Sequence, residues 1–182
     1  MIAGGALVRA FLRIFGAGLL AITLAGCLLS DRDPPPGEPS FYRSLATHGA
    51  ELDLAAAQSM ISGYRRNNGL GPVTIDPLLV RLAQEQAKIM AERDKLDHSA
   101  GRPFQERIRT SGFDAKVAVE NVSAGYHTLA EAFSGWRDSP PHRANMLLSG
   151  ATRMGIAAVY APGSKFKVFW ALILAAPDEK RT

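Results

Sequence analysis

The sequence predicts an α+β fold in which helices pack on a mainly antiparallel sheet. Apolar residues recur at helical spacing through the middle of the chain, between about residues 51 and 150. After residue 153 the spacing changes to period two, and a Pro-Gly turn divides two strand-like segments. Helices that come first and strands that come late indicate an α+β class rather than alternating α/β units.

The chain opens with the three parts of a secretory signal. Arg9 and Arg13 supply a positive region, and no acidic residue precedes Asp31. Residues 14–25 are apolar and uncharged, shorter than the roughly 20 residues that a transmembrane helix needs. The run ends in small residues, as signal peptides do. We therefore expect residues 1–26 to be a signal peptide; the alternative is an uncleaved anchor helix.

The only cysteine of the chain directly follows this run. Residues 24–27, Leu-Ala-Gly-Cys, resemble the lipobox of bacterial lipoproteins, which implies cleavage before Cys27 and a covalent lipid on its thiol. A single cysteine excludes an intramolecular disulfide. Leu28 in place of an aspartate resembles the outer-membrane sorting pattern, should the cell have two membranes. The sequence predicts a protein of the cell envelope, lipid-anchored to the bacterial membrane, with its domain outside the cytoplasm.

A tether and one domain follow the signal. Residues 27–50 hold the lipidated cysteine and a Pro-rich stretch, which favours extended geometry. Residues 51–182 are long enough for one compact domain. The chain has 21 basic and 17 acidic residues, and two of the basic ones lie in the signal, so the mature chain has a net charge of only +2. This small excess, without a stripe of basic and aromatic residues, argues against nucleic-acid binding.

The helices are predicted from spacing and from capping residues. Asp76 and Pro77 are typical of an N-cap followed by N1, and apolar positions continue at helical spacing until the helix fades near Lys95. Thr128 and Glu131 form a capping-box pattern. The predicted helices cover residues 51–67, 77–95, 103–110, 128–137 and 139 to about 150.

The last part of the domain predicts a β-hairpin. Residues 154–160 alternate in period two, residues 161–164 have Pro and Gly where a type II turn needs them, and residues 166–175 are almost continuously apolar. A strand that is apolar on both faces belongs at the centre of a sheet. We therefore expect Trp170 to be a buried core residue, and we expect the same of Trp136.

Three side chains stand out as candidates for chemistry. His98 follows the second predicted helix, Glu120 lies in an otherwise apolar segment, and His142 follows a Ser-Pro-Pro sequence. Distance along the chain does not indicate whether they meet.

Four segments together resemble the CAP superfamily, also called the SCP domain. They are residues 68–79, the His98-Ser99 pair, residues 120–122 and residues 136–147, of which the last is the most specific. The resemblance spans about residues 54–175 and implies a three-layer α-β-α sandwich. It also implies a cavity lined by two histidines and two acidic residues, which binds a divalent metal in some members.

His98, Glu120 and His142 match three of these cavity positions. The second histidine is of the bacterial type, because the strand around Trp170 lacks the histidine that animal members carry there. Glu131 and Asp138 are the candidates for the second acid, although capping explains Glu131 and Asp138 could cap the following turn.

Two imidazoles and a carboxylate form a usual zinc set with one position left for water, and imidazole also suits nickel and copper. The same three groups could instead form a hydrogen-bonded structural network. The sequence thus leaves Zn²⁺ or another divalent metal as an open possibility, beside the lipid on Cys27.

The resemblance favours a ligand-binding module over an enzyme, because few CAP members are established enzymes. The ligand classes it implies are a lipid, a sterol, a cell-wall fragment or a protein. The alternatives are a metal-dependent hydrolase or protease of the cell envelope, with Glu120 as base or ligand, and a structural envelope protein. We expect no nucleic-acid partner, and we assign no catalytic residue.

Overall fold

The computed structural model describes residues 37–178, so the predicted signal peptide and Cys27 lie outside the described residues. The compact unit begins at Glu38. Its elements are the 3-10 helix η1 (Ser40–Tyr42), α1 (Leu54–Asn67), β1 (Thr74–Ile75), α2 (Pro77–Glu92), α3 (Phe104–Thr110), β2 (Ala115–Ala124), α4 (Leu129–Asp138), α5 (Pro140–Met146), β3 (Arg153–Tyr160) and β4 (Val168–Pro177).

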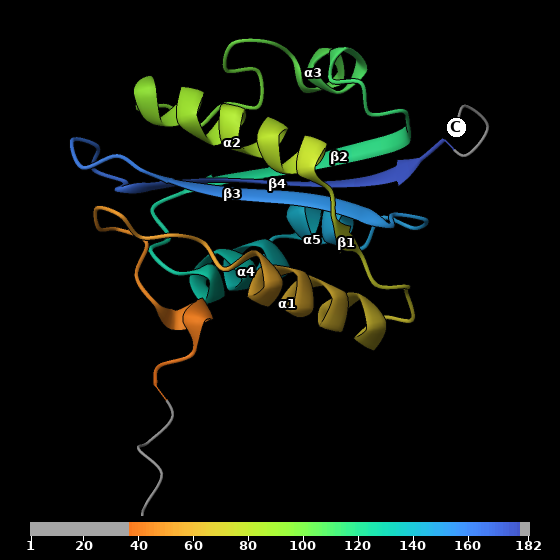
Figure 1. Ribbon diagram of the computed structural model, residues 1–182, viewed down its shortest axis with the longest axis horizontal. Coiled ribbons are helices and arrows are strands. Elements are labelled where there is room, and N and C mark those ends of the chain that lie inside the picture. The colour runs from red at the N-terminus through yellow and green to blue at the C-terminus, as the bar shows by residue number, and fades with distance from the viewer. Residues whose placement is uncertain (1–36, 179–182) are drawn as a thin grey trace, which may run out of the picture. The chain divides into compact units, whose positions relative to one another are not determined.

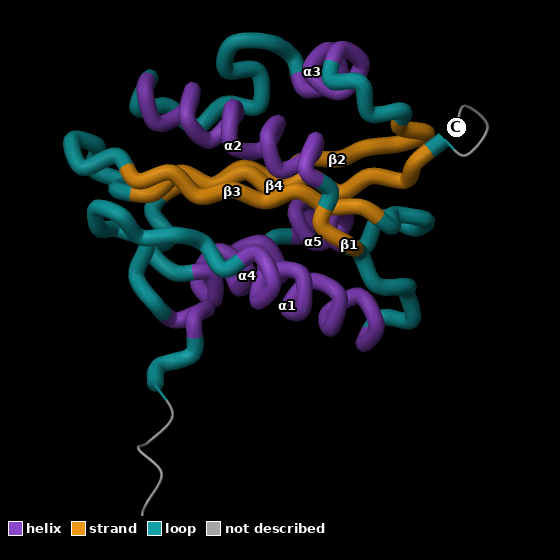
Figure 2. The backbone as a smooth tube through the Cα atoms, in the orientation of Figure 1, coloured by secondary structure: helices purple, strands orange, loops and turns teal. Residues whose placement is uncertain are grey.

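The elements form three layers (Figure 1). Helices α2 and α3 lie on one face of the sheet, and helices α1, α4 and α5 lie on the other. The tube view shows the strands as a single middle layer between these two sets of helices (Figure 2). The predicted α+β class and the three-layer α-β-α arrangement are confirmed.

The four described strands form one sheet in the order β1-β3-β4-β2. The β3–β4 and β4–β2 pairs are antiparallel, whereas the two-residue β1 pairs parallel to β3. The sheet is therefore mixed, with the predicted hairpin at its centre. β2 pairs with β4 and is the last strand in the order, so its other side is an edge of the sheet.

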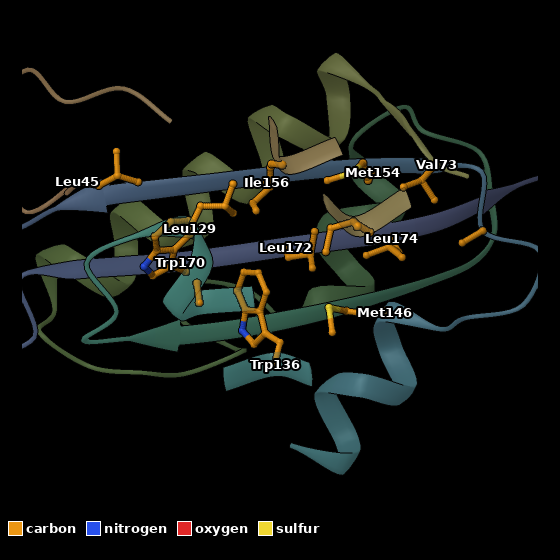
Figure 3. Packing of buried hydrophobic residues seen from close by; sticks show 14 of the residues in the cluster. Leu45, Val73, Leu129, Trp136, Met146, Met154, Ile156, Trp170, Leu172 and Leu174 are labelled. Carbon is orange, nitrogen blue, oxygen red and sulfur yellow. The ribbon is translucent and has the colours of Figure 1, made fainter. Parts of the chain in front are cut away.

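Each face of the sheet packs a separate core. Trp136, Trp170 and Leu172 are among the buried residues under α1 and α4, and Figure 3 labels all three among the side chains that pack against the strands. Their ring centroids are 6.2 Å apart in an edge-on arrangement. The prediction that both tryptophans are core residues is confirmed, with 1% and 0% exposure.

The compact domain begins earlier than the predicted boundary at residue 51. Leu45 is buried in the core, and its backbone N–H donates to the carbonyl of His127 at 2.7 Å. Ser40 donates to the carboxylate of Asp53, the residue that caps α1, at 2.6 Å. These contacts make residues 38–50 part of the folded unit rather than tether.

Caps decide where the predicted helices begin. Asp76 accepts from the N–H groups of Leu78 and Leu79, as predicted for the start of α2. α5 ends at Met146, earlier than the predicted limit near residue 150. Ser139 occupies the N-cap position of α5, but its side chain makes no capping hydrogen bond. Within the described residues no helix is long and apolar enough to cross a membrane.

Candidate functional site

Glu120 is the centre of the candidate site. It lies in the middle of β2, where Ala118 and Val122, two residues before and after it, pack into the core beneath α2. Side chains two apart on a strand point to the same face, so Glu120 faces α2 and α3. Its side chain is only 1% exposed. A buried carboxylate needs charged or hydrogen-bonding partners, and Glu120 has both.

Arg107 provides the countercharge. Its Nη2 donates to Glu120 Oε1 at 2.8 Å, and its side chain is 3% exposed, so the ion pair is buried at both ends. The same nitrogen donates to the carbonyl of His98 at 3.2 Å, while Nε donates to the carbonyl of Arg102 at 3.3 Å. Arg107 therefore ties α3, the loop before it and β2 together.

Sequence reasoning missed Arg107. The signal was present, because Arg107 lies three residues after Phe104 and beside Ile108, on the buried side of α3. Its guanidinium carbon stands 5.2 Å from the centre of the Phe104 ring. An arginine on the apolar side of a short helix needs a buried hydrogen-bond acceptor. Here that acceptor is the carboxylate of Glu120.

His98 takes the other oxygen of the carboxylate. Its Nδ1 is 3.0 Å from Glu120 Oε2, while 54% of its side-chain surface is exposed. The hydrogen bond to Glu120 raises the pKa of His98, and this gain exceeds the opposite effect of partial burial. The predicted meeting of His98 and Glu120 is thus observed.

His142 reaches the site from the other face of the sheet. It lies on α5, and its carbonyl accepts from Asn121 Nδ2 at 2.9 Å. Asn145 Nδ2 donates to the Glu120 carbonyl at 3.0 Å and to Asn121 Oδ1 at 2.9 Å. These bonds hold α5 against the free edge of β2, and through them Asn121 satisfies the carbonyl of His142.

The two histidines have different electrostatic surroundings. Burial lowers the pKa of His142, and the nearby positive charge of His98 lowers it further. The imidazoles are therefore close enough to interact electrostatically. Between the two pKa values His142 is neutral while His98 is still charged, and above both values the two imidazoles are neutral.

The two candidates for a second acid have other partners. Glu131 completes the capping box of α4: its N–H donates to Thr128 Oγ1, and its Oε2 accepts from the N–H groups of His127 and Thr128. Asp138 is exposed and accepts two hydrogen bonds from the neighbouring Arg137, at 2.8 and 3.1 Å. No described contact links either residue to Glu120 or His98.

Glu120 does not fit the role of a metal ligand in this arrangement. Arg107 and His98 occupy one oxygen each, and the carboxylate is closed to solvent. Across residues 37–178, no group of three or more His, Cys, Asp or Glu side chains is placed to hold a metal ion. The zinc site stays a prediction, with His98 and His142 as its remaining candidate ligands. The part of this site that faces solvent is the imidazole of His98, whose orientation is fixed by Glu120.

The chain is similar to known proteins in sequence and in fold. The profile described as CAP: Cysteine-rich secretory protein family matches residues 58–174. An uncharacterized protein of Bacillus subtilis, YkwD, is 32% identical over 103 residues, which cover 55% of this chain and 40% of that protein. The chain thus spans less than half the length of this relative.

Solved structures show the same fold. An outer surface protein from Borrelia burgdorferi superposes with a TM-score of 0.62 at 18% identity, covering 69% of this chain and 92% of the other. An extracellular protein containing a SCP domain, from Bacillus anthracis, gives a TM-score of 0.58 at 20% identity, covering 67% of this chain and 39% of the other.

Proposed function

The chain belongs to the cysteine-rich secretory protein (CAP) family, and from that premise we propose that it is an exported, lipid-anchored module that binds a ligand in the cell envelope. The ligand is bound at the cluster formed by His98, Glu120 and Arg107. Its candidate classes are a lipid, a sterol, a cell-wall fragment or a protein.

The contrast in exposure between His98 and Glu120 carries this proposal. Glu120 and Arg107 form a buried pair behind a histidine whose side chain is 54% exposed. Desolvating two charges costs several kcal/mol per ion, which good geometry and added hydrogen bonds must offset. Because this buried pair lies directly behind His98, it fixes the orientation of an imidazole that a ligand can reach from solvent.

The geometry supports binding better than hydrolysis. A metal-dependent hydrolase would need Glu120 as a ligand or as a base that reaches a bound water. Here Glu120 is closed to solvent and engaged at both oxygens. The proposal therefore assigns the contact with the ligand to His98 and no catalytic step to Glu120.

Native mass spectrometry of the protein extracted from its own membranes tests the proposed binding. The wild type should carry a bound mass beyond its lipid anchor, and His98→Ala should lose most of it. His127→Ala is the matched control, since His127 is also exposed but lies away from the cluster, before α4. Equal retention in His98→Ala and wild type, or no bound mass in either, would contradict binding at this site.

The lipid anchor is tested separately. The proposal rests on the lipobox-like residues 24–27. Several acyl chains anchor a protein stably, at roughly 0.8 kcal/mol per buried CH₂ group. Cys27→Ala should therefore accumulate as a longer precursor or leave the membrane fraction. A Cys27→Ala protein that is processed and retained like wild type would contradict the anchor.

A further inference from the structure

The hydrogen bond between His98 and Glu120 fixes which ring nitrogen carries the proton. An ionised carboxylate only accepts hydrogen bonds. The Arg107 guanidinium, 2.8 Å from Oε1, keeps a charged partner beside Glu120 inside the fold. Nδ1 of His98, 3.0 Å from Oε2, must then be the donor. A neutral His98 consequently has its free lone pair on Nε2.

We propose that Arg107 and Glu120 are positioning residues that hold His98 in the Nδ1–H tautomer, so that Nε2 is the atom with which the site accepts a hydrogen bond from a hydroxyl or ammonium group of the ligand. This inference rests on the proposed binding function and names the contact that the site makes.

The exposed fractions of the three side chains indicate which residue contacts the ligand and which residues position it. Ligand can reach His98, whereas the Glu120 and Arg107 side chains are 1% and 3% exposed. A carboxylate that orients a histidine from behind, through the ring nitrogen that does not meet the ligand, is a recurrent arrangement in protein sites. Each oxygen of Glu120 already has a partner, Arg107 or His98, which favours a hydrogen-bonding ligand at His98 over a metal on the carboxylate.

Arg107 also fixes the position of the ring. Its bond to the His98 carbonyl holds the main chain, and its bond to Glu120 holds the partner of the side chain. The backbone of His98 and the orientation of its ring therefore depend on the same guanidinium. Glu120 itself is held from the β2 edge by Asn145, which donates to its carbonyl.

Glu120→Gln gives a sharp test, because the amide can satisfy Arg107 in only one way. Arg107 needs an acceptor, so the amide oxygen should face Arg107 and the amide NH₂ should face His98. Nδ1 must then accept, and the proton should move to Nε2. The substitution preserves shape, so the fold should persist while the tautomer inverts.

The measurement is the ¹⁵N pattern of the His98 ring at about pH 8.5, above the reference pKa of histidine near 6.5. We expect mainly Nδ1–H in wild type and mainly Nε2–H in Glu120→Gln. Glu106→Gln, on the same helix as Arg107, is the matched control and should behave as wild type. Mainly Nε2–H in wild type, or no change in Glu120→Gln, would overturn the proposal.

The double variant Arg107→Met/Glu120→Gln isolates Arg107. Without the guanidinium the amide is free to turn its oxygen to His98, and no buried charge is left unpaired. The inverted tautomer should therefore be lost. If the double variant remains as inverted as Glu120→Gln alone, Arg107 does not position the site.

The tautomer is measured without ligand, so the tautomer prediction can be wrong even if the protein carries a bound ligand. In native mass spectrometry Glu120→Gln should reduce the bound mass at least several-fold, and Glu106→Gln should not. Unchanged ligand retention in a tautomer-inverted variant would overturn the assigned Nε2 contact while leaving the binding function in place. A bound mass in neither wild type nor variant would instead contradict the binding function.

Discussion

His98 and His142 carry opposite pKa shifts although they lie near each other. The hydrogen bond from Glu120 favours the charged form of His98, and burial favours the neutral form of His142. We expect NMR titration to give a pKa above about 6.5 for His98 and below it for His142. The reverse order would contradict the observed geometry.

These shifts also set the sign of two contributions to stability. The contribution of His98 is fully present below its unfolded pKa and is lost as pH rises through the raised folded value. The contribution of His142 is present above its unfolded pKa and is lost as pH falls through the lowered folded value. Around pH 6.5 the two oppose each other, so removing either histidine should reveal the pH dependence of the other.

At the scale of single residues, the sequence predicted two of the three residues of the cluster. His98 and Glu120 came from family resemblance, and the structure brings them into contact. Glu131 was correctly attributed to capping from the local spacing alone. Arg107 was missed because its partner lies on a strand 13 residues away, and only the packing of α3 on β2 joins them. An ion pair between a helix and a strand depends on tertiary packing, so the local sequence around either residue does not predict it.

The central strand β4 depends on its large buried residues. Trp170 is fully buried, packs edge-on against Trp136, and donates from Nε1 to the carbonyl of Tyr126 at 2.8 Å. Trp170→Ala should lower the free energy of unfolding by about 3–5 kcal/mol. Urea unfolding measures this loss, with Tyr42→Ala as a control at an exposed aromatic. A loss below about 1 kcal/mol would show that the packing of β4 does not depend on Trp170.

Arg65 joins two elements that lie far apart in the sequence. From α1 it donates to four carbonyls, each at 2.9 Å: those of Gly71, Met146, Leu148 and Ala151. Burial lowers the pKa of Arg65. The four hydrogen bonds of its planar guanidinium offset the free-energy cost of burying the charge. α1 is thereby fixed to the segment that follows α5.

Lysine cannot reproduce this fork. Arg65→Lys keeps the charge but loses at least one donor and the planar geometry, so we expect a loss of about 2–4 kcal/mol in unfolding free energy. Arg66→Lys, one residue later and exposed, should change stability by less than about 0.5 kcal/mol. Similar losses in the two variants would argue against a special role for Arg65.

Elements with strong local signals were predictable, and elements set by pairing were not. Spacing and caps located α2 and α4, and period two with a turn located the β3–β4 hairpin. β1 has two residues and exists through its pairing with Arg153 and Met154. β2 was missed because residues 120–123 are all buried although three of them are polar, so polarity along the strand does not follow the two faces of the sheet.

At the scale of the whole molecule, the domain includes a stretch that composition assigned to the tether. Residues 38–50 are rich in small and polar residues, yet Leu45 enters the core and Ser40 bonds to the cap of α1. Such docking depends on a pocket formed by distant elements, which local composition does not reveal. The folded unit therefore begins at Glu38, inside the range 27–50 that was predicted as tether.

The proposed function requires three conditions at once. The domain must lie outside the cytoplasm, the thiol of Cys27 must be blocked by lipid, and His98 must face solvent. Because Cys27 is the only cysteine, a second cysteine placed at position 98 reports on all three. A membrane-impermeant maleimide reacts with exposed, unmodified thiols, and a change in mobility counts the thiols that react.

The most direct test is maleimide labelling of His98→Cys in intact cells, with any outer membrane permeabilised. We predict one labelled thiol in His98→Cys and none in the wild type. Ser123→Cys, at a position that is 7% exposed, should label only after denaturation. Labelling of His98→Cys only after the cells are lysed, or equal labelling of wild type through Cys27, would contradict the account of a lipid-anchored, exported domain with an open His98 site.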